Sequence, residues 1–249
     1  MNTWHLRPLI GLDLETTGVD PETDRIVTGS VVRFGGGAPT DGQSWLSDAG
    51  GVEIPAGATA VHGITTAAAR SAGRPAGVVV AGMIDAVVAS VADGLPLVAM
   101  NATFDLTMLD REARRHGVVP LVDRATPYVL DPKVLDKRAD RFRKGGRTLT
   151  DLCRHYVVPL DGAHTSDADA VAACAVTWKL TNRYRWLARM SLAELHSAQV
   201  LWAAEQAVEL RAYFERTPGK EDWVGGVRLE WPILPAPRVG DRTCPSPRP

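Results

Sequence analysis

The sequence is poor in cysteine and has no long apolar run. Its three cysteines, at positions 153, 174 and 244, are far apart, and none has the short spacing of a zinc knuckle. An odd number of scattered cysteines gives no disulfide framework, so we expect a reducing compartment. No window approaches the roughly 18 apolar residues of a membrane span, and the N-terminus has no apolar signal core. We therefore expect a cytoplasmic protein without a membrane partner.

An excess of charge of either sign is also missing. The chain has 28 basic and 29 acidic residues, which gives a formal net charge of -1. Binding to nucleic acid would therefore need a local basic patch rather than a global positive field. A composition of 45% hydrophobic and 23% charged residues is typical of a globular protein and excludes disorder as the main state. With 249 residues, the chain can form one sizeable domain with an appendage, or two small domains.

The hydrophobic pattern predicts an α/β fold with a mixed sheet. Residues 8–16, 25–35 and 40–47 have strand patterns and are separated by turn-rich segments, which favours an antiparallel meander. Two short apolar segments, 95–100 and 126–131, predict further strands, which makes five. Helical spacing of apolar residues predicts helices over residues 76–94, 103–117, 148–157, 166–190 and 191–217. Such an order of elements predicts a mixed sheet with helices packed on both faces.

The C-terminal part is expected to differ from the main domain, to which we assign residues 1–188. Residues 189–217 form a predicted helix that begins with a capping box, Ser191 with Glu194. Residues 218–249 form a tail rich in tryptophan and proline, in which Gly225 and Gly226 could turn a short hairpin. The proline-rich end of this tail is expected to be extended or disordered.

Four carboxylates and one histidine stand out along the chain. Asp13 and Glu15 lie on one face of the first strand, where like charges resist burial unless a positive partner is present. Asp105 and Asp169 each lie in the first turn of a predicted helix, and His164 precedes Asp169 by five residues. Singly, such acids can favour a helix dipole or face water at a sheet edge. Together they suit an oxygen-ligand site for Mg²⁺ or Mn²⁺.

Three motifs in this order resemble the DEDDh 3′→5′ exonucleases of the DnaQ-like group, which have an RNase H-like fold. The motifs are "DLETTG", "NATFD" and "HTSDAD", and "VHGIT" at residues 61–65 resembles a further segment of that group. The resemblance covers roughly residues 8–185. It implies an exonuclease domain over residues 1–188, with Asp13, Glu15, Asp105 and Asp169 as metal ligands and His164 as general base. Asp167 is an additional acid, and the His-x4-Asp spacing selects Asp169 instead.

The same resemblance implies a two-metal mechanism with two Mg²⁺ or Mn²⁺ ions. Asp13, Glu15 and Asp169 would hold the ion that carries the attacking water. Asp13 and the scissile phosphate would share the second ion, and Asp105 would act through bound water. His164 would take a proton from the water, and a nucleoside monophosphate would leave the 3′ end.

Contacts to the substrate are expected from residues near these motifs. Backbone N–H groups that follow the acids within the first motif could meet the terminal sugar, and apolar or aromatic side chains could stack on the terminal bases. A basic segment, residues 133–147, has seven basic and two acidic residues and could follow the phosphate backbone, or could simply be a solvated helix. The candidates for substrate binding are Thr16, Thr17, Gly18, His62, Ile64, Asn101, Phe104 and Arg147.

Several functions remain open from the sequence. We expect an exonuclease acting mainly on single-stranded DNA ends, but an RNA exonuclease of the oligoribonuclease or RNase T kind would use the same catalytic residues. No motif indicates a contact to the 2′-OH that would discriminate the sugars. The pattern is also compatible with an inactive nucleic-acid-binding or polymerase-associated module and with a small-molecule phosphohydrolase. The C-terminal helix and tail could mediate dimerisation or recruit a polymerase.

Overall fold

A central five-stranded sheet organises the molecule, as the sequence predicts. The structure, a computed structural model, describes residues 4–160 and 164–236. The strands follow the order β3-β2-β1-β4-β5, in which the first three pair antiparallel and the last three pair parallel. β4 and β5 are much shorter than the apolar segments that predicted them. The strands are β1 (Leu9–Thr16), β2 (Ile26–Phe34), β3 (Asp41–Leu46), β4 (Leu97–Val98) and β5 (Val129–Leu130).

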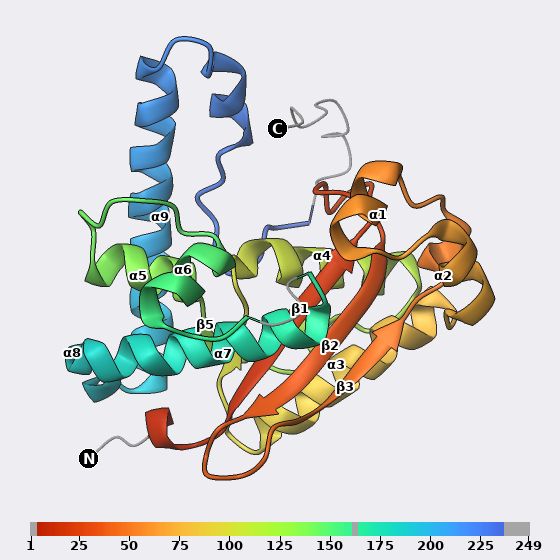
Figure 1. The fold of residues 1–249 in the computed structure, drawn as a ribbon, viewed down its shortest axis with the longest axis horizontal. Coiled ribbons are helices and arrows are strands. Elements are labelled where there is room, and N and C mark those ends of the chain that lie inside the picture. The colour runs from red at the N-terminus through yellow and green to blue at the C-terminus, as the bar shows by residue number, and fades with distance from the viewer. Residues whose placement is uncertain (1–3, 161–163, 237–249) are drawn as a thin grey trace.

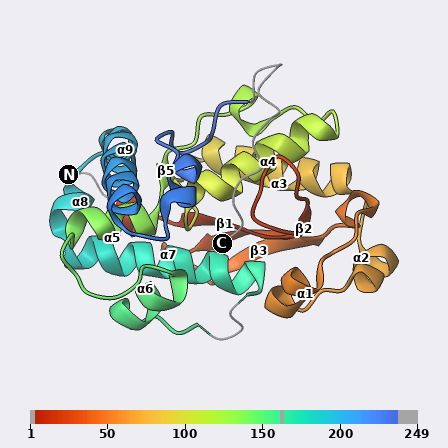
Figure 2. The ribbon, with the colours of Figure 1, turned by 90° about the horizontal axis from the view of Figure 1, so that it is seen from above.

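Helices cover both faces of this sheet (Figures 1 and 2). On one face, α7 (Ser166–Arg183) crosses β1 and β2. On the opposite face lie α3 (Ala76–Ala92) and α4 (Ala102–Arg115), which also pack against each other. The predicted mixed sheet with helices on both faces is therefore confirmed.

Shorter helices and one long helix complete the described structure. The long helix packs against α5 and β5, and its predicted capping box is confirmed: Ser191 Oγ accepts from the Glu194 N–H at 3.2 Å, and Glu194 Oε2 accepts from the Ser191 N–H at 2.7 Å. These helices are α1 (Ala56–His62), α2 (Thr66–Ala72), α5 (Pro132–Ala139), α6 (Leu149–Tyr156), α8 (Arg185–Arg189) and α9 (Leu192–Arg216).

Two local predictions are wrong. The helix predicted over residues 166–190 is interrupted at Tyr184, where ψ is 74°, and this turn lets Leu187 of α8 enter the core. The hairpin predicted at Gly225 and Gly226 is instead a 3₁₀ helix, Glu221–Gly226, whose Trp223 packs edge-on against Phe214 of α9. An aromatic contact with α9 thus replaces strand pairing. The end of the predicted proline-rich tail, residues 237–249, lies outside the described residues.

A close approach between β1 and α7 prepares the position of the site. A Cβ atom at Gly11 would lie 2.6 Å from the carbonyl oxygen of Ala170 and 2.9 Å from Sγ of Cys174, both on α7. Only glycine fits at this position. Since side chains alternate along a strand, Gly11 shares its face with Asp13 and Glu15. The two acids of β1 therefore face the helix that carries Asp169.

Candidate active site

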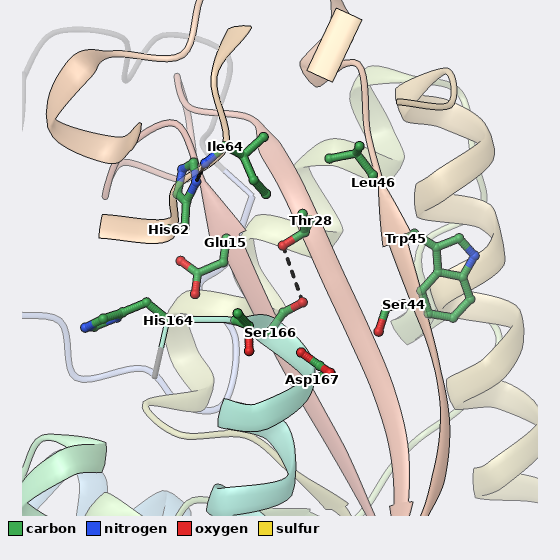
Figure 3. A pocket seen from close by; sticks show the side chains of 11 residues that line it. Glu15, Thr28, Ser44, Trp45, Leu46, His62, Ile64, His164, Ser166 and Asp167 are labelled. Carbon is green, nitrogen blue, oxygen red and sulfur yellow. Dashed lines mark hydrogen bonds between the residues drawn. The ribbon is translucent and has the colours of Figure 1, made fainter. Parts of the chain in front are cut away.

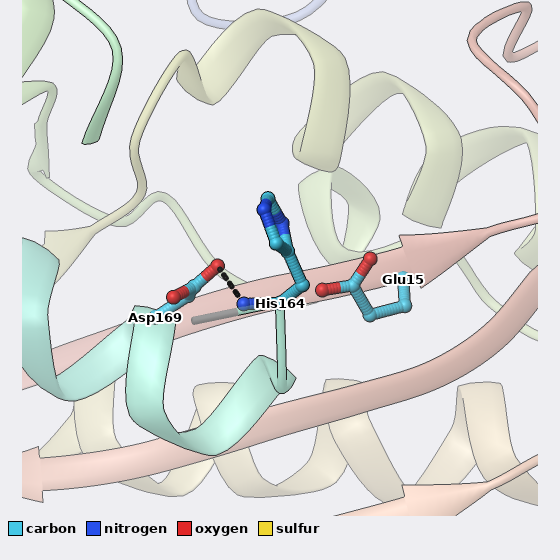
Figure 4. A group of neighbouring side chains, drawn as sticks. All are labelled: Glu15, His164 and Asp169. Atoms are coloured by element: carbon cyan, nitrogen blue, oxygen red, sulfur yellow. Dashed lines mark hydrogen bonds between the residues drawn. The ribbon is translucent and has the colours of Figure 1, made fainter. Parts of the chain in front are cut away.

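Glu15, His164 and Asp169 come together at the end of β1 and the start of α7. One ligand atom from each lies within 4.8 Å of the others. Figure 4 shows the imidazole of His164 rising between the two carboxylates. A break in the β1–β2 register between Glu15 and Thr16 ends the regular pairing directly after Glu15. Residues more than 140 positions apart in the sequence thus form one cluster.

Asp13 and Asp105 belong to the same group of acids. Asp105 is buried in the first turn of α4, which follows β4, the parallel neighbour of β1. Burial raises the pKa of Asp13 well above its usual range, and the charges of Asp105, Asp169 and Glu15 raise it further. The pKa of Asp105 is also raised, first by burial and then by the nearby Asp131 and Glu15 carboxylates. The four carboxylates therefore share one electrostatic environment.

The cluster is poorly compensated by the protein itself. Burial and the charge of Asp169 raise the pKa of Glu15 to about 7. Burial also raises the pKa of Asp169, although a hydrogen bond from the His164 backbone N–H, 3.3 Å from Oδ2, opposes this effect. The other oxygen of Asp169, Oδ1, is buried and has no hydrogen-bond partner among the described residues. Divalent cations would satisfy these oxygens, because carboxylates are the ligands that hard cations prefer.

His164 lies at the solvent side of this cluster. Its φ of 69° is in the left-handed region, and its side chain is exposed. An exposed side chain can pass a proton to bulk water, which a general base requires after each turnover. Its position beside Glu15 and Asp169 suits the role that the third motif implies.

A cavity of about 290 Å³ opens beside the acids (Figure 3). Glu15 and His164 line it together with His62 and Ile64, two of the predicted substrate contacts. The Ile64 backbone N–H donates to His62 Nδ1 at 3.1 Å and so orients the imidazole. The volume of the cavity is at the lower end of the range for small-molecule sites. The cavity can therefore receive one terminal group rather than a long segment of polymer.

The remaining residues predicted near the first two motifs serve mainly to shape the backbone. Thr17 is almost fully buried; its N–H donates to the Arg25 carbonyl at 2.9 Å, and its hydroxyl donates to Asp24 at 2.9 Å. Thr16 Oγ1 donates to the Gly18 carbonyl at 2.6 Å. Phe104 is partly buried and packs against the main core. The groups of Thr17 are thus already engaged within the turn.

Arg147 lies in a different environment from the one that the sequence suggested. Its Nε donates to Asp136 Oδ2 at 2.7 Å, and its second nitrogen donates to the Asp140 carbonyl at 2.7 Å. Asp136 is fully buried and also accepts from Arg143 and from the Tyr156 hydroxyl. Arg147 therefore neutralises a buried acid that ties α5 to α6.

Asp131 was missed by the sequence reasoning. It is buried, and it accepts hydrogen bonds from the backbone N–H groups of Asn101 at 3.2 Å and Ala102 at 3.0 Å. These contacts hold Asn101 in the left-handed conformation (φ 61°) directly before α4, the helix of Asp105. The only sequence signal is an Asp before a Pro at a helix start, which is common at helix N-termini.

The chain is similar to known proteins in family and in fold. A family model described as "Exonuclease" matches residues 10–177. No curated protein sequence matches the chain significantly. Among solved structures, Exonuclease I of E. coli in complex with a dT13 oligonucleotide aligns with a TM-score of 0.54 and 17% identity over 72% of this chain and 43% of that one.

Two further solved structures align with similar TM-scores and sequence identities. The zinc-bound form of the E. coli Exonuclease I–ssDNA complex aligns with a TM-score of 0.56 and 18% identity over 72% of this chain and 42% of that one. A moderately thermophilic Exonuclease I from Methylocaldum szegediense aligns with a TM-score of 0.58 and 19% identity over 83% of this chain and 45% of that one. This chain thus spans less than half the length of these relatives, and the likeness to them shows a shared fold.

Proposed function

Because the chain belongs to the Exonuclease family, we propose that it is a metal-dependent 3′→5′ exonuclease that releases nucleoside monophosphates from mainly single-stranded DNA ends. The observation that carries this proposal is the convergence of Glu15, His164 and Asp169 within 4.8 Å, with Asp13 and Asp105 in the same electrostatic environment. Buried carboxylates that raise each other's pKa are costly to the fold, and such sites are characteristic of function.

Asp13, Glu15, Asp105 and Asp169 would hold two ions, Mg²⁺ or Mn²⁺. When bound, such ions stabilise negative charge on a phosphodiester and lower the pKa of coordinated water. The buried Oδ1 of Asp169, which has no hydrogen-bond partner in the part of the chain that the structure describes, and the raised pKa of Asp13 support this donor set. The Asp131 carboxylate fixes the start of α4 and thereby the position of Asp105.

His164 would accept the proton of the attacking water at its imidazole and release it to solvent. Its exposure at the rim of the cluster supports this role. The 3′-terminal nucleotide would enter the cavity, where His62 and Ile64 present an imidazole face and an apolar face to it. Contacts of this kind grip a base without reading its identity.

DNA is the preferred substrate in this proposal. Exonuclease I of E. coli, which shares the fold, is described in complex with dT13 and dA16 oligonucleotides. RNA is the alternative substrate. The hydroxyl groups of Thr28, Ser44 and Ser166 line the cavity and are the groups that a 2′-OH could meet.

The test is digestion of 5′-labelled single-stranded DNA and RNA of the same sequence, with Mg²⁺, with Mn²⁺ and with chelator. We expect a ladder that shortens from the 3′ end, with DNA consumed faster and no products in chelator. Asp13→Asn should abolish the ladder while its urea unfolding curve stays cooperative. Faster loss of RNA would overturn the DNA preference, and unchanged digestion by the Asp13→Asn variant would overturn the site itself.

A further inference from the structure

The positive charges of the basic segment, residues 133–147, separate into two groups in the folded chain. Its four arginines are all paired with carboxylates: two with the buried Asp136 and two with glutamates of α9. These pairs are Arg143–Asp136 (2.9 Å), Arg147–Asp136 (2.7 Å), Arg138–Glu205 (3.6 Å) and Arg141–Glu209. Arg143 and Arg147 neutralise Asp136, Arg138 and Arg141 connect the segment to α9, and most of the arginine charge is compensated within the protein.

The three lysines of the segment are different. No ion pair to Lys133, Lys137 or Lys144 is found among the described residues. Lys133 and Lys137 are four residues apart on α5, so they share a face and follow each other at about 6 Å. This distance is similar to the step between phosphates in an extended single strand.

The row of lysines begins at the candidate active site. Lys133 Nζ donates to Asn101 Oδ1 at 3.0 Å, and Asn101 directly precedes α4, whose first turn carries Asp105. Lys133 is exposed, so its remaining N–H groups face solvent. A strand whose 3′ end occupies the cavity would therefore meet Lys133 before any other cation of α5.

Lys137 has three other cations and one acid, Glu209, in its electrostatic surroundings. Burial lowers the pKa of Lys137, the charge of Glu209 raises it, and the nearby charges of Arg147, Lys133 and Arg141 lower it. An anion at this face would relieve the repulsion among the cations. A phosphate group is such an anion.

An exposed aromatic ring lies just beyond the row. Phe142, in the loop after α5, is 89% exposed, more than any other large hydrophobic side chain in the described structure. The guanidinium of Arg141 lies 5.7 Å from its ring. A phenyl ring held in water between basic residues is the arrangement by which proteins stack unpaired bases.

We propose that α5 and the loop after it bind the single strand upstream of the scissile phosphate, with Lys133 and Lys137 on successive phosphates and Phe142 stacked on a base. The proposal rests on the proposed exonuclease function and specifies its substrate as single-stranded DNA several nucleotides long. Phosphate contacts supply affinity and stacking extends the footprint, and neither reads sequence.

The test measures equilibrium binding of 5′-fluorescein oligo-dT by anisotropy, in the Asp13→Asn background so that no strand is cut. Lys133→Gln and Lys137→Gln should each reduce the slope of log K against log salt by about 0.7, the value for one phosphate of a single strand. Lys133→Arg and Lys137→Arg should restore it. The matched control is Lys179→Gln, because Lys179 is exposed on α7, 13 residues beyond Ser166; it should leave the slope unchanged.

The role of Phe142 is tested with DNA strands of two lengths. Phe142→Ala should weaken binding of a twelve-nucleotide strand roughly 5- to 150-fold, as expected for one lost base stack, and leave a dinucleotide unaffected. Phe142→Trp should keep the affinity for the long strand. The proposed binding of the strand along α5 is wrong if the lysine variants keep the slope of log K against log salt of the parent protein and Phe142→Ala binds DNA like the parent, while the wild-type chain still degrades DNA. Absence of any hydrolysis or binding by the wild-type chain would instead reject the proposed function.

Discussion

At the scale of single residues, the acids of β1 lie where burial opposes their charge. Asp13 and Glu15 share the face of β1 on which Gly11 allows a close approach of α7. Both have raised pKa values because they are buried beside other carboxylates. Without a cation, the folded protein therefore carries a penalty at neutral pH that the unfolded chain does not.

This penalty predicts how stability depends on pH when metal is removed. Between pH 4.5 and about 7, Glu15 binds a proton in the folded state but not in the unfolded chain. The Glu15 contribution to the free energy of unfolding should therefore increase as pH falls from 8 to 5, by roughly 1–3 kcal/mol after allowance for partial exposure. Urea titrations in chelator at each pH measure it as the difference between wild type and Glu15→Gln. Parallel curves for the two proteins would contradict the raised pKa.

Asp136 is the residue on which the packing of α5 and α6 depends. It is fully buried and binds Arg143, Arg147 and the Tyr156 hydroxyl. We expect Asp136→Asn to lower the free energy of unfolding by roughly 3–5 kcal/mol, because two partly buried guanidinium groups lose their counter-charge.

Urea unfolding of Asp136→Asn is best compared with Asp85→Asn. Asp85 is 63% exposed and pairs with Arg124 at the surface, so its loss should change stability by less than about 1 kcal/mol. Equal effects of the two substitutions would show that the Asp136 network is not a stabilising core.

At the scale of elements, α9 is more than an appendage to the sheet. Gln199 is fully buried; its Oε1 accepts from the Asp131 N–H at 2.8 Å, and its Nε2 donates to the Val129 carbonyl at 2.9 Å. Asp131 in turn holds the start of α4. A chain of hydrogen bonds thus leads from α9, which lies beyond residues 10–177, to the helix of Asp105.

This connection predicts that Gln199→Met affects catalysis as well as stability. Stability should fall by roughly 1–3 kcal/mol because buried polar groups lose their partners. The kcat should fall about tenfold with little change in KM, since Asp105 would shift while the substrate cavity is unchanged.

Gln206→Met is the matched control for this variant. Gln206 lies two turns further along α9 and donates to the Val134 carbonyl of α5 at 3.0 Å rather than to Asp131 or its neighbours on β5. It should lose stability and keep its kcat. A loss of kcat in both variants would attribute the effect to general loosening of α9.

At the scale of the whole molecule, features that follow a regular pattern or a motif along the sequence were predictable. Features that depend on contacts between distant residues were not. The RNase H-like sheet and the DnaQ-like relationship follow from alternation in β1–β3 and from three motifs in order, and both are confirmed. The break at Tyr184 was invisible because residues 166–190 are helix-forming throughout, and only packing of Leu187 into the core separates α7 from α8. Gly-Gly after Trp223 suggested a turn between strands, but an aromatic contact with Phe214 decides the local structure.

Some residues of the candidate site could likewise be predicted from the sequence, and others could not. Acids with a fixed position in a motif could be named in advance. Asp131 and Gln199 could not, because they act through backbone groups of residues about 30 and 70 positions away. Arg147 belongs to a basic run, and sequence alone cannot show that a buried Asp136 pairs with it. None of the described helices is long and apolar enough to cross a bilayer.

The central claim is that the carboxylates of β1, α4 and α7 together bind divalent cations. Anomalous diffraction from crystals soaked in Mn²⁺ tests it most directly. We expect peaks among Asp13, Glu15, Asp105 and Asp169 that disappear in Asp13→Asn crystals. Crystals that diffract well and show these four side chains without any manganese peak among them would contradict it.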